Sequence, residues 1–228
     1  MIFKDYASYY DLIYKDKPYK QEAEFVCDWA NKPKTILDLG CGTGRHIYYL
    51  APKVEQIIGI DASLEMLTLA YMHTKKFNNV RYIFNKTDKR LLDLPKVDCA
   101  TALFNVVGYI GLEECLKYLP LKKNGLFIFD IWDSAKVHSY SFGRKCLGNH
   151  WYRESLLTRR NNNQVQVDIA IFKKKRKHIY EEQKVYEKHL LTAYSKQDIE
   201  KIGKRFNYKI VDIKPTENWS CWFKLQRL

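Results

Sequence analysis

The first half of the chain alternates between short apolar runs and segments with helical patterning. The apolar runs lie at residues 35–37, 56–60, 80–84, 97–104 and 125–133. Runs of this length are typical of parallel strands that are buried on both faces. The segments with helical patterns and start signals lie at residues 18–31, 45–50, 63–76 and 112–119. This alternation predicts an α/β fold in which helices cover both faces of a largely parallel sheet.

The pattern changes after residue 136. Apolar residues then alternate with polar ones at Val165, Val167, Ile169 and Ile171. This period of two predicts an antiparallel meander with strands at residues 153–160, 165–173 and 178–190. We interpret the meander as an insert after the fifth strand, not as an independent domain. The chain then returns to the first sheet through a helix and two strands, at residues 195–206, 208–214 and 218–228, the last strand being antiparallel to its neighbours.

Composition and charge narrow the class of protein. The chain has 228 residues, of which 46% are hydrophobic, enough for one α/β domain with a small appendage. We expect a cytoplasmic protein without a membrane span, because no apolar run approaches the roughly 20 residues that a bilayer requires. The six cysteines form no C-x-x-C pair, so we expect reduced thiols and no metal site. The net charge of +13 favours anionic partners, although a lysine-rich surface can equally reflect an AT-rich genome.

A glycine-rich loop follows the first apolar run and is the strongest functional signal. Gly40, Gly42 and Gly44 let the backbone turn sharply and come close to a ligand that any Cβ would exclude. The second run ends in Asp61, a carboxylate placed to accept hydrogen bonds from both hydroxyls of a ribose. Dinucleotide-binding loops have the spacing G-x-G-x-x-G, whereas this loop has G-x-G-x-G. Asp38, just before the glycines, would repel a pyrophosphate but could orient an ammonium group.

The loop therefore favours a nucleoside that carries a positive charge, and it resembles motif I of the class I S-adenosylmethionine (SAM) methyltransferases. The resemblance implies a Rossmann-like seven-stranded sheet, SAM as cofactor, S-adenosylhomocysteine as product and no metal. It also implies that Cys41 lies in the cofactor loop and that Ala62 and Met66 lie near the adenosine. Related enzymes carry Gly-Asp-Met-Arg after the third strand, and their acid contacts the adenine. This chain keeps the acid as Asp88, between Thr87 and Lys89.

The N-terminal arm is dense in tyrosine. Tyr10 and Tyr14, followed by Tyr19 at a helix start, resemble the N-terminal motif of methyltransferases that act on sugars and small amines. The resemblance implies that the arm closes over SAM as a lid, that Tyr14 and Tyr19 contact the cofactor, and that Tyr14 faces the transferred methyl group. The alternative is that these tyrosines only hold the arm on the domain.

The end of the fourth apolar run should also lie in the crevice, because ligands in open α/β sheets bind beyond the carboxyl ends of the strands. Base-modifying amino-methyltransferases carry Asn/Asp-Pro-Pro-Tyr there, whereas residues 104–109 contain no proline. Phe104, Gly108 and Tyr109 instead resemble the sugar amine methyltransferases, in which this segment borders the methyl donor. The candidate substrate ligands are Tyr10, Tyr109, Asp130, Asp133 and Trp151. The alternative role of the two aspartates is to cap the following loop.

The chain shows no convincing histidine-based dyad, which favours methylation of an amine over that of a hydroxyl. Some N-methylating sugar enzymes carry a histidine near the position of Pro120, and this chain has none. His150, beside Trp151, is the best candidate for a base among the histidines of the insert.

We therefore expect methyl transfer from SAM to a small-molecule acceptor, most simply the amine of a nucleotide-linked, and so anionic, amino sugar. One alternative is O-methylation of a sugar or methylation of another small amine. Another is an RNA-binding methyltransferase or a SAM-binding module that docks phosphates on residues 173–177.

The expected organisation follows from this resemblance. Residues 1–32 form the arm and lid helix, 33–135 the SAM-binding core, 136–194 the insert that roofs the acceptor or makes a homodimer contact, and 195–228 the end of the core sheet.

Overall fold

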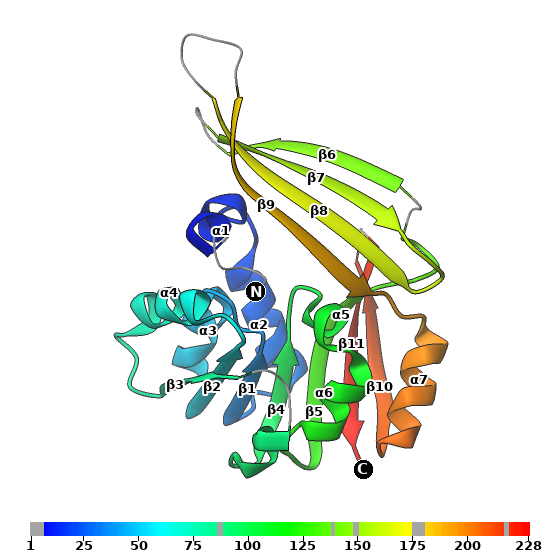
Figure 1. The fold of residues 1–228 in the computed structure, drawn as a ribbon. Helices are drawn as coiled ribbons and strands as arrows, with labels where there is room; N and C mark the ends of the chain where they lie inside the picture. Colours follow the sequence, from blue (N-terminus) through cyan, green and yellow to red (C-terminus); the bar gives the residue numbers. More distant parts are fainter. Residues whose placement is uncertain (1–6, 86–88, 138–139, 148–150, 175–180, 217–218) are drawn as a thin grey trace.

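The computed structural model describes residues 7–85, 89–137, 140–147, 151–174, 181–216 and 219–228. These residues form a seven-stranded sheet and, above it in Figure 1, a four-stranded sheet. The larger sheet consists of β1 (Thr35–Leu39), β2 (Gln56–Asp61), β3 (Val80–Phe84), β4 (Val97–Ala102), β5 (Leu121–Trp132), β10 (Tyr208–Pro215) and β11 (Ser220–Arg227). Its strand order is β10-β11-β5-β4-β1-β2-β3.

The pairing of the strands confirms the predicted topology. Strands β1 to β5 run parallel to one another, and β11 is antiparallel to both β5 and β10. Asp38 of β1 stands in register with Gly59 of β2 and Thr101 of β4. The carboxyl ends of these three central strands therefore meet at one edge of the sheet, where the glycine loop begins.

Helices cover both faces of the larger sheet, as predicted. The helices are α1 (Ala7–Ile13), α2 (Tyr19–Trp29), α3 (Arg45–Leu50), α4 (Leu64–Thr74), α5 (Val106–Ile110), α6 (Leu112–Tyr118) and α7 (Lys196–Arg205), with short 3₁₀ turns at Ala51–Lys53 and Lys89–Asp93. Residues of α2, α3 and α4 form one apolar core with the sheet, and residues of α5, α6 and α7 form another on the opposite face. Helices α4 and α7 begin at the residues that the sequence predicts. The Ser63 hydroxyl accepts from the Met66 N–H at the start of α4, and Ser195 and Asp198 form a capping box at the start of α7.

The smaller sheet, which we call the roof sheet, consists of β6 (Tyr140–Cys146), β7 (Trp151–Arg159), β8 (Gln164–Lys174) and β9 (Glu181–Thr192). Its strands are antiparallel neighbours in chain order, which confirms the predicted meander. The insert leaves the core at Trp132 and returns at Tyr194, whose N–H donates to the Trp132 carbonyl at 3.1 Å. The two ends of the insert thus lie side by side.

Three elements differ from the predictions. Strand β6 was not expected, because its side chains are mostly exposed and carry no alternating apolar pattern. Helix α1 lies in the arm, where the tyrosine-rich sequence gives no helix-start signal. Helix α5 is only five residues long and follows Asn105, which adopts a left-handed backbone conformation that a sequence pattern does not reveal.

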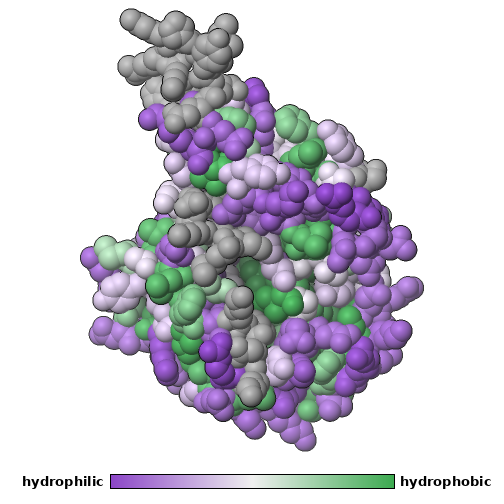
Figure 2. Space-filling view, viewed as in Figure 1, coloured by the Kyte–Doolittle hydropathy of each residue, from purple (hydrophilic) through white to green (hydrophobic). Residues whose placement is uncertain are grey.

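The arm lies between the two sheets (Figure 1). Ile13 of α1 packs in one apolar cluster with Ile169, Ile171 and Val185 of the roof sheet. The visible face of the molecule is hydrophilic over much of the roof sheet and over α7, and apolar patches gather near the junction of the two sheets (Figure 2). Among the described residues, no helix has the length and apolar character needed to cross a membrane.

Candidate active site

The glycine loop has the backbone geometry that its sequence predicts. Gly40, Gly42 and Gly44 have φ values of +59°, +54° and +71°, in the left-handed region that favours glycine. A Cβ on Gly40 would lie 2.7 Å from the Val106 side chain, so this glycine lets α5 approach the loop. A Cβ on Gly42 would meet no atom within 4 Å. Gly42 therefore presents bare backbone to open space, which suits a ligand that lies close to the chain.

Asp61 closes the loop from the end of β2. Its carboxylate accepts hydrogen bonds from the backbone N–H of Gly42 at 2.9 Å and of Ser63 at 2.8 Å. Burial raises the pKa of Asp61, and the backbone hydrogen bonds oppose that shift. Ala62, next in the chain, is exposed, whereas Met66 is buried beneath the start of α4.

Asp38 is a buried carboxyl group close to Asp61. Its side chain is 2% exposed and accepts a hydrogen bond from the Thr101 hydroxyl at 2.7 Å. Burial raises the pKa of Asp38 to about 7, and the nearby Asp61 carboxylate adds to the shift. Since no cation is paired with either carboxylate among the described residues, the pair favours a positively charged ligand group.

The arm is tied to the glycine loop through Asp11. The Asp11 carboxylate accepts from the Thr43 hydroxyl at 2.7 Å and from Arg45 Nε at 3.2 Å, and it lies 3.2 Å from His73 Nε2 of α4. The loop, α3 and α4 therefore all hold α1. The lid arrangement that the family resemblance implies is compatible with this geometry.

The tyrosines of the arm gather around Phe104. The Tyr14 ring meets Phe104 edge-on at 4.8 Å between centroids and lies 4.8 Å from the Tyr10 ring. The Tyr14 hydroxyl accepts from Arg153 Nη1 of the roof sheet at 3.3 Å. Tyr10, Tyr14 and Phe104 thus form an aromatic wall where arm, core and roof meet.

Three buried donors near this wall have no hydrogen-bond partner within the described part of the chain: the Tyr19 hydroxyl, Asn105 Nδ2 and Arg153 Nε. A buried donor without a partner is costly, so each indicates a place for a ligand acceptor. Together with the bare backbone at Gly42 and the paired acids, the Tyr19 and Asn105 donors fit a zwitterionic nucleoside such as SAM.

Lys17 is a site residue that the sequence analysis missed. Its ammonium lies 4.9 Å from the centre of the Phe104 ring and 5.2 Å from that of Tyr19, and it forms an ion pair with Glu22. Glu22 also lies 2.7 Å from His46 Nε2. A single lysine in a lysine-rich arm carries no signal in the sequence, because only the fold places it over two aromatic rings.

The predicted substrate aspartates have structural partners. Asp130 is buried and accepts from the backbone N–H groups of Phe104 and Asn105, both of which have positive φ. Burial raises the pKa of Asp130 to about 6, and these N–H groups oppose the shift. The Asp133 carboxylate accepts from the Ala135 N–H at 2.9 Å. The geometry of Asp133 therefore matches the alternative role, in which it caps the loop after β5. Asp130 instead holds the strained loop before α5, at Phe104 and Asn105.

The remaining candidates divide between described and undescribed residues. Trp151 of β7 packs against Tyr9 at 5.1 Å between ring centroids, and the Lys173 ammonium lies 5.5 Å from its ring. Cys41 is buried, and its N–H donates to the Ile60 carbonyl at 3.0 Å. Asp88, His150 and residues 175–177 lie outside the described residues.

Tyr109, a predicted substrate ligand, joins α5 to the roof sheet through two residues that the sequence analysis did not single out. The Tyr109 hydroxyl lies 3.2 Å from Nδ1 of His189, which is fully buried in β9. Glu187 Oε2 lies 3.3 Å from the other ring nitrogen. The sequence does contain a signal for this group. Glu187 and His189 alternate with Val185 and Leu191 on one face of a strand, and polar residues at buried positions of this kind indicate a polar contact in the interior.

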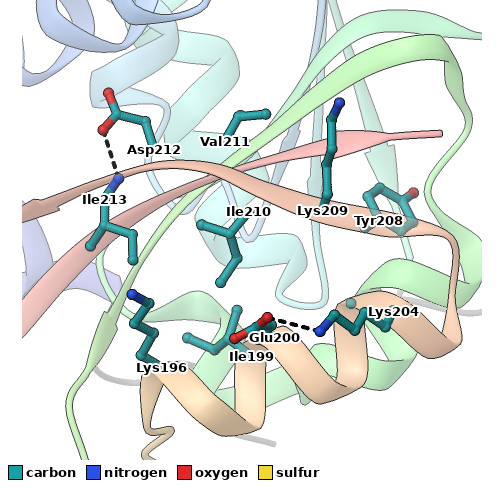
Figure 3. Close-up of a pocket in the computed structure, with 11 residues that line it drawn as sticks. Lys196, Ile199, Glu200, Lys204, Tyr208, Lys209, Ile210, Val211, Asp212 and Ile213 are labelled. Atoms are coloured by element: carbon teal, nitrogen blue, oxygen red, sulfur yellow. Dashed lines mark hydrogen bonds and ion pairs between the residues drawn. The ribbon is translucent and has the colours of Figure 1, made fainter.

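A pocket of about 500 Å³ lies away from this region, between α7 and β10 at the edge of the larger sheet (Figure 3). Apolar side chains such as Ile199 and Ile210 line it, and one of its two acids, Glu200, is paired with Lys204. None of the predicted site residues lines it. Among the described residues, no group of three or more His, Cys, Asp or Glu could hold a metal ion.

The strand order, the glycine loop and the two acids define the class I SAM-dependent methyltransferase fold. The comparisons with known proteins agree. Residues 36–120 match the family described as "Methyltransferase domain". The resemblance seen in the sequence is thus confirmed at the level of the class, and with it SAM as the cofactor of that class.

Individual relatives are more distant. A putative methyltransferase of Geobacillus is 27% identical over 148 residues, which cover 60% of each chain. The dTDP-3-amino-3,6-dideoxy-alpha-D-glucopyranose N,N-dimethyltransferase of Streptomyces fradiae is 29% identical over 112 residues, 46% of this chain and 42% of that protein. The SAM-bound structure of an amino pentose methyltransferase from Micromonospora echinaspora superposes with a TM-score of 0.80 at 20% identity, covering 100% of this chain and 98% of that one. The chain thus spans less than two thirds of the curated relatives, while the fold extends over all of it.

Proposed function

We propose that this protein transfers a methyl group from SAM to the amine of a small amino sugar that carries an anionic, nucleotide-linked group. The observation that carries the proposal is the position of Arg153. This guanidinium extends from the roof sheet to Tyr14, has a buried Nε without a partner, and forms no ion pair with a described residue. An unpaired arginine above the aromatic wall suits a phosphate or diphosphate of the acceptor.

Other features support an amine as the nucleophile. Residues 104–109 lack the prolines of base-modifying enzymes, and the relatives include a dimethyltransferase and a methyltransferase whose names refer to amino sugars. A neutral amine needs only to lose a proton before it attacks, so the site does not require a strong base during methyl transfer.

The residues of the chain would act mainly by positioning. Gly42 and Asp61 would hold the nucleoside, Asp38 the ammonium group and Tyr19 the polar end of the cofactor. SAM, when bound, supplies an activated methyl group whose sulfur leaves as a neutral thioether. The acceptor nitrogen would have to be held facing that methyl carbon. Tyr14 and Phe104 would line the path between the two atoms and exclude water, so that alignment provides most of the rate.

The test is a methyl-transfer assay with a panel of acceptors. Purified protein and SAM are incubated with nucleotide-linked amino sugars, with the corresponding sugars in which a hydroxyl replaces the amine, and with short RNA. Mass spectrometry should detect added methyl groups on the amino sugars. Asp61→Ala should abolish the reaction, whereas Glu200→Ala on the remote helix α7 should not. Methylation of the RNA, or of the hydroxyl sugars alone, would contradict the proposal.

A further inference from the structure

The Asp11 carboxylate, which ties the arm to the core, contacts side chains from three different segments. One of its oxygens accepts hydrogen bonds from the Thr43 hydroxyl of the glycine loop at 2.7 Å and from Arg45 Nε of α3 at 3.2 Å. Its other oxygen lies 3.2 Å from Nε2 of His73, near the end of α4. These contacts place a histidine, a residue type whose charge ordinarily changes between about pH 5 and 8, where α1 is held.

The other ring nitrogen of His73 determines where the hydrogen of the neutral imidazole lies. His73 Nδ1 is 2.7 Å from the backbone carbonyl oxygen of Thr43. A carbonyl oxygen only accepts, so Nδ1 carries the hydrogen of this bond. The neutral imidazole has a single N–H, and its Nε2 therefore turns a lone pair toward the Asp11 carboxylate. Protonation of Nε2 replaces this repulsion between a lone pair and an anion with an attraction between opposite charges.

Four segments place groups around His73, and their charges set its response to pH. Asp11 of α1 attracts an imidazolium, Arg45 of α3 repels it, and the glycine loop contributes the uncharged Thr43. Because the Arg45 side chain is 39% exposed and that of Asp11 only 24%, solvent screens the repulsion more than the attraction. Next to α4 itself, the Lys76 ammonium donates to a tyrosine hydroxyl of α3 at 2.7 Å. The balance favours a protonated ring beside Asp11.

A second histidine near the arm responds differently. His46 of α3 lies 2.7 Å from the Glu22 carboxylate of α2, and not against α1. Burial lowers the pKa of His46, and the hydrogen bond with Glu22 opposes the shift. His46 therefore remains mostly neutral between pH 8 and pH 6, and a change in how α1 is held over this range can be assigned to His73.

We propose that His73 and Asp11 form a pH-sensitive latch for the arm, closed when the imidazole is protonated and loosened when it is neutral. Docking of α1 brings a carboxylate to the imidazole, so the docked arm favours proton uptake. By linkage, α1 is held more tightly at pH 6 than at pH 8, and this extra hold is lost as the imidazolium deprotonates. Since the arm is bonded to the glycine loop, the loosened arm releases S-adenosylhomocysteine faster. The latch goes beyond the proposed function, because it requires no particular acceptor.

Hydrogen exchange of the ligand-free protein tests the latch directly. Amide protection of residues 7–13, corrected for the intrinsic effect of pH on exchange, should be about two- to fivefold higher at pH 6 than at pH 8, the size expected of a partly exposed ion pair. His73→Gln cannot take up a proton, and Asp11→Asn keeps an oxygen for the Thr43 hydroxyl but loses the charge. Each variant should show equal protection at the two pH values. Lys76→Gln is the matched control, since it removes a cation beside α4 that bonds to α3, and it should retain the full pH dependence.

The dissociation rate of S-adenosylhomocysteine shows whether the latch acts on the cofactor site. The ratio of the rate in His73→Gln to that in the unchanged protein should be about two to five at pH 6 and about one at pH 8. Taking the ratio cancels the titration of Asp38 and of the ligand itself, which both proteins share.

Three results would overturn the latch. They are equal protection of residues 7–13 at both pH values in the unchanged protein, a pH dependence that persists in His73→Gln, and a ratio of dissociation rates that does not vary with pH. Nitrogen NMR adds a check on the ring, because neutral His73 should carry its hydrogen on Nδ1, and a hydrogen on Nε2 would remove the basis of the inference. None of these measurements uses an acceptor, so a failed methyl-transfer assay leaves the latch unaffected.

Discussion

Replacing Asp38 with asparagine should make the ligand-free protein more stable and its cofactor binding weaker. The side chains have nearly the same shape, and the asparagine oxygen can still accept the hydrogen bond that Thr101 donates to Asp38 at 2.7 Å. The substitution therefore removes mainly a charge. Since that charge is buried next to Asp61, the folded protein gains from its loss.

The size and pH dependence of the effect follow from the pKa of Asp38, which burial raises from 3.8 to about 7. The folded state holds the proton more tightly than the unfolded chain, so this group stabilises the protein fully below its unfolded pKa. That stability is lost as the pH rises through the folded value. At 1.36 kcal/mol per unit, Asp38→Asn should increase the free energy of unfolding by about 2 kcal/mol at pH 5 and by about 4 kcal/mol at pH 8, as upper bounds.

Urea unfolding at the two pH values measures this difference, and calorimetry measures S-adenosylhomocysteine binding. Loss of a charge-assisted hydrogen bond to the ligand ammonium should weaken binding about 10- to 100-fold at pH 8. Asp98→Asn is the control, and it should lower the free energy of unfolding instead of raising it. The reason is that hydrogen bonds from Lys122 and Thr35 lower the pKa of Asp98 despite its partial burial. A variant at Asp38 that is less stable than the original at pH 8, or that binds the ligand equally well, would refute the reasoning.

Three further predictions concern the same region. Gly42→Ala should cost only about 1–2 kcal/mol of stability, from its left-handed backbone, yet abolish S-adenosylhomocysteine binding in a thermal-shift assay; normal binding would contradict the ligand's close approach. Asp11→Ala should release α1, seen as faster hydrogen exchange of residues 7–13 and a KM for SAM raised about tenfold, and unchanged exchange would argue against the tether. Arg153→Gln should raise KM for a nucleotide-linked acceptor at least tenfold but leave S-adenosylhomocysteine affinity unchanged; equal effects on both ligands would place Arg153 at the cofactor.

The cofactor half of the molecule was predictable because its signals are local. Gly40, Gly42 and Gly44 need positive φ, and Asp61 follows a buried strand, so sequence spacing alone places them at one edge of the sheet. Helix starts such as Ser63 follow from side chains that bond to nearby backbone. Each of these features depends on residues within one turn or strand.

The half proposed to bind the acceptor was less predictable because its geometry depends on contacts between distant segments. Tyr109 and His189 are 80 residues apart and meet only when the roof sheet lies on α5. Lys17 becomes a site residue only where Phe104 and Tyr19 surround it. The left-handed backbone at Phe104 and Asn105, which Asp130 holds, has no marker in a single sequence because neither residue is glycine.

The junction of the insert with the core has a consequence for how such enzymes diversify. Trp132 and Tyr194 are joined by a backbone hydrogen bond of 3.1 Å, so the chain leaves and re-joins the core at a single point. A different segment could be inserted between these two residues without moving them, because its two ends would only have to lie side by side. Under the proposed function, new acceptors could thus be acquired in evolution, or by engineering, through exchange of this one segment, while the half proposed to bind the nucleoside stays intact.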